Sequence, residues 1–175
     1  MHNWQIPKGP APELIPLCRK IAAEGAVLLE NRQNILPLPP ATRLAVFGRI
    51  QTTYYKSGTG SGGLVNIVKQ PSIIRALRMA PDLVIDEIVA DSYTQWCEEN
   101  PFDNGSGWAG EPWCQKEMPL DEGMVAASAQ RNDAALIIIG RSAGEDHDNA
   151  NAAGSFRLTA EENRMMAVVS RYFAK

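Results

Sequence analysis

The chain has 175 residues, of which 45 % are apolar and 21 % are charged, and its formal net charge is −3. This length and composition are typical of one soluble globular domain with a sizeable core. The negative charge and the lack of a basic stripe argue against nucleic-acid binding, and the longest apolar run is far too short to cross a membrane.

Apolar spacing and turn residues divide the chain into alternating helices and strands. After an extended segment over residues 1–10, the predicted helices cover residues 12–25, 71–80, 86–99, 121–130 and 159–173. Gly25 ends the first helix, Pro71 lies in the first turn of the second, and Asp86 caps the third. The predicted strands are residues 44–47, 83–85 and 134–140. Residues 27–29 are predicted to be either a short buried strand or a continuation that docks on the core. A long loop rich in Gly, Trp and Pro spans residues 101–119, and loops of that length tend to be functional.

The C-terminal part of the chain indicates how the domain is organised. The unbroken apolar run over residues 134–139, ended by Gly140, is typical of a fully buried strand in a parallel sheet. The last helix begins with a capping box, Thr159-Ala-Glu-Glu162, and carries an apolar stripe over residues 165–173. No further strand follows to cover that stripe, so we expect it to be exposed and the domain to be incomplete at its C-terminus.

Strands that alternate with helices predict an α/β fold. We expect a three-layer α/β/α sandwich with a mostly parallel sheet, formed by residues 11–175 as the front portion of a larger domain. In such sheets, ligands bind beyond the carboxyl ends of the strands.

An acidic segment follows the last predicted strand. It reads Arg141-Ser-Ala-Gly-Glu145-Asp-His-Asp148-Asn149 and places three carboxylates in four positions. Glu145, beside glycine and close to other acids, could be poised for proton transfer. The residues alone also allow a polar loop whose acids are merely solvated.

Five stretches occur in a characteristic order along the chain: Ala22-Ala-Glu-Gly-Ala-Val-Leu-Leu-Glu-Asn31, Ile35-Leu-Pro-Leu38, Ser57-Gly-Thr-Gly-Ser-Gly-Gly63, Asn104-Gly-Ser-Gly-Trp-Ala-Gly-Glu-Pro-Trp113 and Gly140-Arg-Ser-Ala-Gly-Glu-Asp-His-Asp-Asn149. In this order they resemble the α/β-sandwich domain of glycoside hydrolase family 3, in the branch that places this domain first. Many members have glycine after the glutamate and Asp-Arg later, where this chain has Asp146 and Asn149.

The resemblance implies part of a retaining, β-glucosidase-like glycosidase that hydrolyses terminal β-linked sugars. Glu145 would be the general acid/base and Asp148 an orienting neighbour, while the nucleophilic aspartate would lie in a barrel domain that these residues do not contain. A general acid must be protonated near neutral pH. We expect the charges of Asp146 and Asp148, together with desolvation by the covering barrel domain, to raise the pKa of Glu145. The implied partners are a β-glucoside or related oligosaccharide and the barrel domain. The protein could also form a homodimer.

Other residues are candidates for sugar binding. Lys56 and Ser57, at the edge of the glycine-rich stretch, could donate hydrogen bonds to a sugar, although exposed loop residues need no such role. Trp108 and Trp113 could stack on a pyranose ring, although tryptophan is more often partly buried for its apolar area.

Two other functions remain open. The chain could be a non-catalytic carbohydrate-binding or interaction module derived from the same domain. It could also bind a nucleotide, because Gly58, Gly60 and Gly63 match G-x-G-x-x-G, but the preceding strand ends ten residues too early for that motif.

We expect no metal and no other cofactor, since Ala150 occupies the third ligand position of the only calcium-like spacing. Cys18, Cys97 and Cys114 are an odd number without metal-ligand spacing, which favours reduced thiols. No signal peptide is recognisable at the N-terminus, so we expect a cytoplasmic protein.

Overall fold

The computed structural model describes residues 9, 11–56, 58–64, 67 and 70–175. These residues belong to two compact units, residues 1–37 and residues 38–175, each of which is described by itself. The extended segment expected over residues 1–10 lies outside the described residues apart from Gly9. None of the described helices is long and apolar enough to span a membrane.

The first unit contains one α-helix, α1 (Leu14–Glu24), and a 3-10 turn, Arg32–Asn34. Gly25 is the C-cap of α1, so the predicted helix and its end are confirmed. The strand predicted over residues 27–29 is wrong: these residues form no strand, and their side chains are exposed, Leu29 to 92 %. Three apolar residues are too short a run to specify a strand when no neighbouring strand offers a hydrogen-bond ladder.

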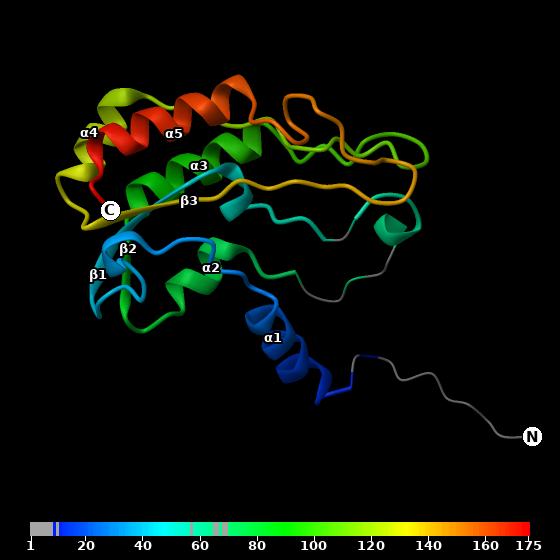
Figure 1. Ribbon diagram of the computed structural model, residues 1–175, viewed down its shortest axis with the longest axis horizontal. Coiled ribbons are helices and arrows are strands. Elements are labelled where there is room, and N and C mark those ends of the chain that lie inside the picture. Colours follow the sequence, from blue (N-terminus) through cyan, green and yellow to red (C-terminus); the bar gives the residue numbers. More distant parts are fainter. Residues whose placement is uncertain (1–8, 10, 57, 65–66, 68–69) are drawn as a thin grey trace, which may run out of the picture. The chain divides into compact units, whose positions relative to one another are not determined.

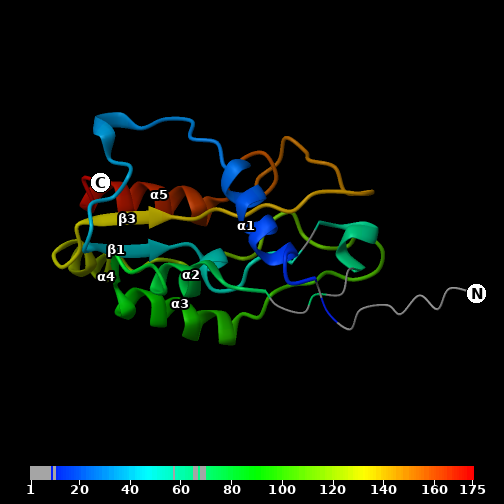
Figure 2. The ribbon, with the colours of Figure 1, turned by 90° about the horizontal axis from the view of Figure 1, so that it is seen from below.

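The second unit is built on a parallel sheet. Its strands are β1 (Thr42–Phe47), β2 (Leu83–Ile85) and β3 (Ala134–Ile137), in the order β2-β1-β3. The register pairs Leu44 of the central strand with Ile85 on one side and with Ala134 on the other. Figure 2 shows β1 and β3 running side by side in the same direction.

Helices cover both faces of this sheet. They are α2 (Ile73–Arg78), α3 (Glu87–Glu99), α4 (Glu122–Ala129) and α5 (Ala160–Tyr172). Ala45 and Phe47 of β1 pack with buried residues of α3, α4 and α5, whereas Leu44 and Val46 point to the other face, where Ile74 of α2 covers them. Figure 1 shows α3 and α5 on one side of the strands and α2 on the other. The predicted three-layer sandwich with a parallel sheet is therefore confirmed.

The helix caps agree with the sequence pattern in all but one case. Asp86 accepts hydrogen bonds from the amides of Ile88 and Val89 at the start of α3. The capping box between Thr159 and Glu162 is complete at the start of α5. Helix α2 begins later than predicted, at Ile73 with Ser72 as its N-cap, so Pro71 precedes the helix and does not lie in its first turn.

Strand β3 is less buried than its apolar run indicates. Only Ala134 is buried, and the residues from Ala135 to Gly140 are half-buried, so the prediction of full burial was wrong. Among the described strands β3 has a neighbour, β1, on one side only. On its other side, the Ala135 amide donates to the carbonyl of Lys175 at 2.9 Å.

The apolar stripe of α5 is covered, contrary to expectation. Met165, Val168 and Val169 are buried in the core beneath the helix. The ring of Phe173 meets Phe47 edge-on, with 5.9 Å between centroids. Because α5 turns back over the face of the sheet that carries Phe47, its stripe needs no additional strand to bury it.

Gly48 ends β1 where two segments come very close. Its φ is +105°, and a Cβ atom there would lie 2.1 Å from the carbonyl oxygen of Ile138. Glycine is therefore required at this point of the carboxyl edge, from which the loops of the candidate site depart.

Candidate active site

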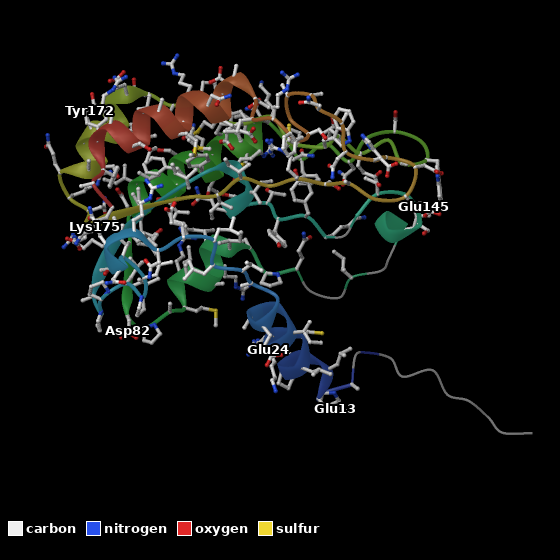
Figure 3. All side chains as sticks on the ribbon, in the orientation of Figure 1. Glu13, Glu24, Asp82, Glu145, Tyr172 and Lys175 are labelled. Carbon is white, nitrogen blue, oxygen red and sulfur yellow. The ribbon has the colours of Figure 1, made fainter. Side chains whose placement is uncertain are left out.

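Three loops extend beyond the carboxyl edge of the sheet and meet one another. They are the glycine loop (residues 58–64), the tryptophan loop (residues 101–119) and the acidic loop (residues 140–149). The tryptophan and acidic loops are joined by a backbone bond from Ser142 N–H to the Trp113 carbonyl, at 2.8 Å. Figure 3 shows Glu145 and Lys175 at opposite ends of the second unit. The loops thus carry this carboxylate well away from the strands.

Glu145 lies in a tight turn. The backbones of Gly144 and His147 hydrogen-bond to each other in both directions, at 3.1 and 3.3 Å. Glu145 and Asp146 occupy the two central positions, and Asp146 has a φ of +56°. A positive φ at the second central position is the pattern of a type II turn, in which glycine is the usual residue.

The glycine loop closes around Glu145. The Ser61 amide donates to Oε2 of Glu145 at 2.8 Å, and the Thr59 hydroxyl donates to its carbonyl at 3.2 Å. Gly60 has a φ of +63°, and a Cβ atom there would lie 2.7 Å from Cβ of Glu145. The absence of a side chain at this position lets the loop backbone approach the carboxylate.

Ser61 lowers the pKa of Glu145. The Ser61 hydroxyl is the largest cause and the Ser61 amide the next, because both stabilise the charged carboxylate, while burial opposes them only weakly at this exposed position. The expected rise in pKa from Asp146 and Asp148 is therefore wrong for this chain. Asp146 instead accepts a hydrogen bond from the indole of Trp108.

We predict that Ser61→Ala raises the pKa of Glu145 towards its ordinary value, because it removes the hydroxyl but keeps the amide. Carboxyl carbon shifts followed by NMR during a pH titration of the chain measure this directly. Ser106→Ala, an exposed serine in the tryptophan loop, is the matched control. An unchanged Glu145 titration in Ser61→Ala would show that the hydroxyl does not stabilise the carboxylate.

The other candidate residues are placed less closely around Glu145. Asp148 is exposed, and its carbonyl, rather than its carboxylate, accepts a bond from the Trp113 indole at 3.1 Å. Lys56 is exposed, and Ser57 lies outside the described residues. Trp108 is 56 % exposed and donates its indole N–H to Asp146 at 2.7 Å. The structure therefore links Trp108 to the turn of Glu145, whereas among the described residues Lys56 forms no hydrogen bond or ion pair with that turn.

Three residues of the site were not identified from the sequence. Thr59 and Ser61 lie within the glycine-rich stretch, where small polar residues between glycines are a signal of close backbone approach. Glu111 packs against the same loop, since a Cβ atom on Gly63 would lie 2.6 Å from its Oε1. No spacing in the sequence pointed to Glu111.

Behind the acidic loop, a buried ion pair joins the loop to α5. The guanidinium of Arg141 donates to both carboxylate oxygens of Glu162 at 2.6 Å, and also to the carbonyls of Gly140 and Ser155 at 2.8 Å. Burial by itself would raise the pKa of Glu162, but the bonds from Arg141 and Thr159 outweigh it and hold that pKa below its ordinary value. This pair fixes where the acidic loop begins and where the following helix starts.

The chain is similar to known proteins over nearly its whole length. Residues 26–174 match the family model described as the glycosyl hydrolase family 3 C-terminal domain. The chain is 47 % identical to a β-glucosidase of Ruminococcus albus over 93 % of its own length and 17 % of that protein. It is 31 % identical to β-glucosidase A of Butyrivibrio fibrisolvens over 91 % of its own length and 21 % of that protein.

Solved structures give the same result. A β-glucosidase from Paenibacillus barengoltzii superposes with a TM-score of 0.90 at 49 % identity, over 94 % of this chain and 18 % of that one. A structure of β-glucosidase 3B from Thermotoga neapolitana in complex with α-D-glucose superposes with a TM-score of 0.79 at 29 % identity, over 92 % of this chain and 22 % of that one. The chain thus spans about a fifth of the length of the relatives it matches.

Proposed function

The chain belongs to glycoside hydrolase family 3, and from this membership we propose that it forms part of a retaining β-glycosidase that hydrolyses terminal β-linked sugars. Glu145 is the general acid/base of the reaction. The nucleophilic aspartate lies in a barrel domain elsewhere in the full-length protein. One observation carries the proposal: three loops beyond the carboxyl edge of the sheet hold Glu145 in a defined, solvent-exposed turn.

The chemistry requires two carboxyl groups, one on each side of the scissile bond. In the first step the nucleophile attacks the anomeric carbon and forms a covalent glycosyl–enzyme, while Glu145 gives its proton to the departing oxygen. In the second step Glu145 takes a proton from water, which attacks the same carbon and releases the sugar with retained configuration. Retention calls for the two carboxyl groups to lie about 5–5.5 Å apart.

An acid with a lowered pKa cannot donate efficiently near neutral pH, so Glu145 needs a different environment in the assembled site. The barrel domain and the bound sugar would exclude water from this exposed carboxylate, and loss of water raises the pKa of a carboxyl group. Displacement of the Ser61 donors would act in the same direction. The lowered pKa is thus a property of the uncovered loop.

Three further residues are proposed to face the substrate. Trp108 has enough exposed ring to stack on a sugar, and the exposed carboxylate of Asp148 and ammonium of Lys56 are free to face substrate. Sugar binding by Ser57 stays a prediction, and so does formation of a homodimer. We also propose a cytoplasmic location, which the three free thiols of Cys18, Cys97 and Cys114 support.

We predict that the chain alone does not hydrolyse aryl β-glucosides, because a single carboxyl group cannot form the glycosyl–enzyme. Release of nitrophenol from the purified chain, compared with the product of the full-length gene, tests this. Turnover by the chain alone that disappears in Glu145→Ala would contradict the two-domain mechanism. A full-length gene without a barrel domain would favour the non-catalytic carbohydrate-binding module instead.

A further inference from the structure

We propose that Trp108 is a positioning residue for Glu145, acting through a hydrogen bond from its indole N–H to the carboxylate of Asp146. This inference rests on the proposed role of Glu145 as acid/base. The bond spans 2.7 Å and joins residues that are 38 positions apart in the sequence. It fastens the tryptophan loop to the residue that directly follows Glu145.

The turn needs an external contact because its backbone conformation is unfavourable. Asp146 has a φ of +56°, in the left-handed region that side-chain-bearing residues rarely adopt. Aspartate tolerates this region better than most residues but is not as free there as glycine. The bond from Trp108 holds the Asp146 side chain in the position that this conformation creates.

The turn is held from both sides. On one side, Thr59 and Ser61 of the glycine loop bond the backbone and carboxylate of Glu145. On the other side lies the tryptophan loop, in which Trp108 donates a hydrogen bond to the carboxylate of Asp146. Within the described residues, the glycine loop forms hydrogen bonds to Glu145 but none to Asp146, so loss of the Trp108 bond would let Glu145 change its orientation.

Trp113 forms a second hydrogen bond from the tryptophan loop to the acidic loop. Its indole donates to the Asp148 carbonyl at 3.1 Å, and its ring lies 5.0 Å from that of His147. This hydrogen bond holds the backbone at Asp148, just after the turn, whereas the bond from Trp108 acts on Asp146 within the turn. Trp108 is therefore the residue whose loss should affect Glu145 most directly.

Positioning and sugar stacking use different parts of Trp108. The N–H edge of the indole is engaged by Asp146, while 56 % of the residue remains exposed and available for stacking. Phenylalanine keeps an aromatic face but has no N–H donor. Trp108→Phe therefore removes the positioning contact selectively, and Trp108→Ala removes both.

The kinetic test uses the full-length enzyme. Trp108→Phe should lower kcat on cellobiose by up to about 10²-fold, the loss that a misplacement near 1 Å produces, with little change in KM. The loss should be much smaller for substrates with acidic phenol leaving groups, which need no protonation. Asp146→Asn, which keeps an acceptor oxygen, should retain most activity, whereas Asp146→Ala should behave like Trp108→Phe. Combining Trp108→Phe with Asp146→Ala should cost no more than either change alone.

A test on the 175-residue chain does not depend on activity. The indole N–H signal of Trp108 should lie downfield of a free indole because it donates to the Asp146 carboxylate, and Asp146→Ala should move it to the free position. A wild-type signal already at the free position, or Trp108→Phe kinetics equal to wild type while Trp108→Ala raises KM, would overturn the proposal in favour of stacking alone. If Glu145→Ala leaves turnover intact, the proposed function fails, and the indole N–H signal still decides whether Trp108 holds this turn.

Discussion

Replacing Glu145 with alanine in the full-length enzyme is expected to lower kcat by about 10²–10⁴-fold on substrates with poor leaving groups, the usual contribution of a positioned general acid. Cellobiose is such a substrate, because the departing glucose oxygen must be protonated as the bond breaks. Glycosides of very acidic phenols depart without a proton, so their glycosylation step should slow far less. A dependence on the leaving group is the signature of a lost acid.

The second half of the reaction supplies an independent measurement. Without Glu145 no base activates water, so the covalent intermediate should accumulate in Glu145→Ala and appear as a burst of phenol. Azide is a nucleophile that needs no base, and it should restore turnover and yield a glycosyl azide of retained configuration. Equal slowing of all substrates and no effect of azide would show that Glu145 is structural.

Asp148 provides the matched control within the same loop. Its carboxylate is exposed, and the bond to this residue from Trp113 goes to the carbonyl. Asp148→Asn should therefore lose much less activity than Glu145→Ala. A comparable loss in Asp148→Asn, with the same leaving-group dependence, would move the acid/base role to Asp148.

The fold was predictable where local signals and the hydrophobic pattern agree. The cap at Asp86 and the capping box at Thr159 marked helix starts because they satisfy backbone amides within a few residues. The continuous apolar run over residues 44–47 of β1 was equally informative, since both faces of a central strand are covered.

Burial was less predictable because it depends on distant parts of the chain. Val84 and Val46 are both valines in apolar runs of strands, yet one is 46 % exposed and the other is buried. What separates them is whether another element packs against them, and no local pattern contains that information. The same reason explains why β3, at the edge of the described sheet, is only half-buried despite its apolar sequence.

In the candidate site, too, some residues could be predicted from the sequence and others could not. Glu145 could be identified because its motif is contiguous in the sequence. Its surroundings could not, because Ser61 reaches Glu145 across 84 positions of sequence and Trp108 reaches the neighbouring Asp146 across 38. The lowered pKa of Glu145 follows from Ser61, so the electrostatics of the acid could not be predicted before its neighbours were known.

Arg141→Ala is expected to lower the free energy of unfolding by about 3–5 kcal/mol, because removing one partner of a buried ion pair leaves the other charge uncompensated. Glu162, whose side chain is only 5 % exposed, would be that stranded charge. Arg141→Lys should also be destabilising, since an ammonium cannot reproduce the two parallel bonds to the carboxylate. Arg157→Ala, which removes an exposed arginine nearby, should change stability by only about 0.5 kcal/mol. Denaturant unfolding of the chain measures all three.

The dependence on pH distinguishes the ion pair from a packing defect. The folded-state pKa of Glu162 is lowered, so its contribution to wild-type stability is present above its unfolded pKa and is lost as pH falls through the folded value. In Arg141→Ala the buried carboxyl group has lost its cation, its pKa rises, and the variant becomes less stable as pH increases. The difference in free energy of unfolding between wild type and Arg141→Ala should therefore widen from acid to neutral pH. A cavity would lower the free energy of unfolding by the same amount at every pH. A difference that does not change with pH would mean that Arg141 stabilises the protein through its bonds to the carbonyls of Gly140 and Ser155, and not through Glu162.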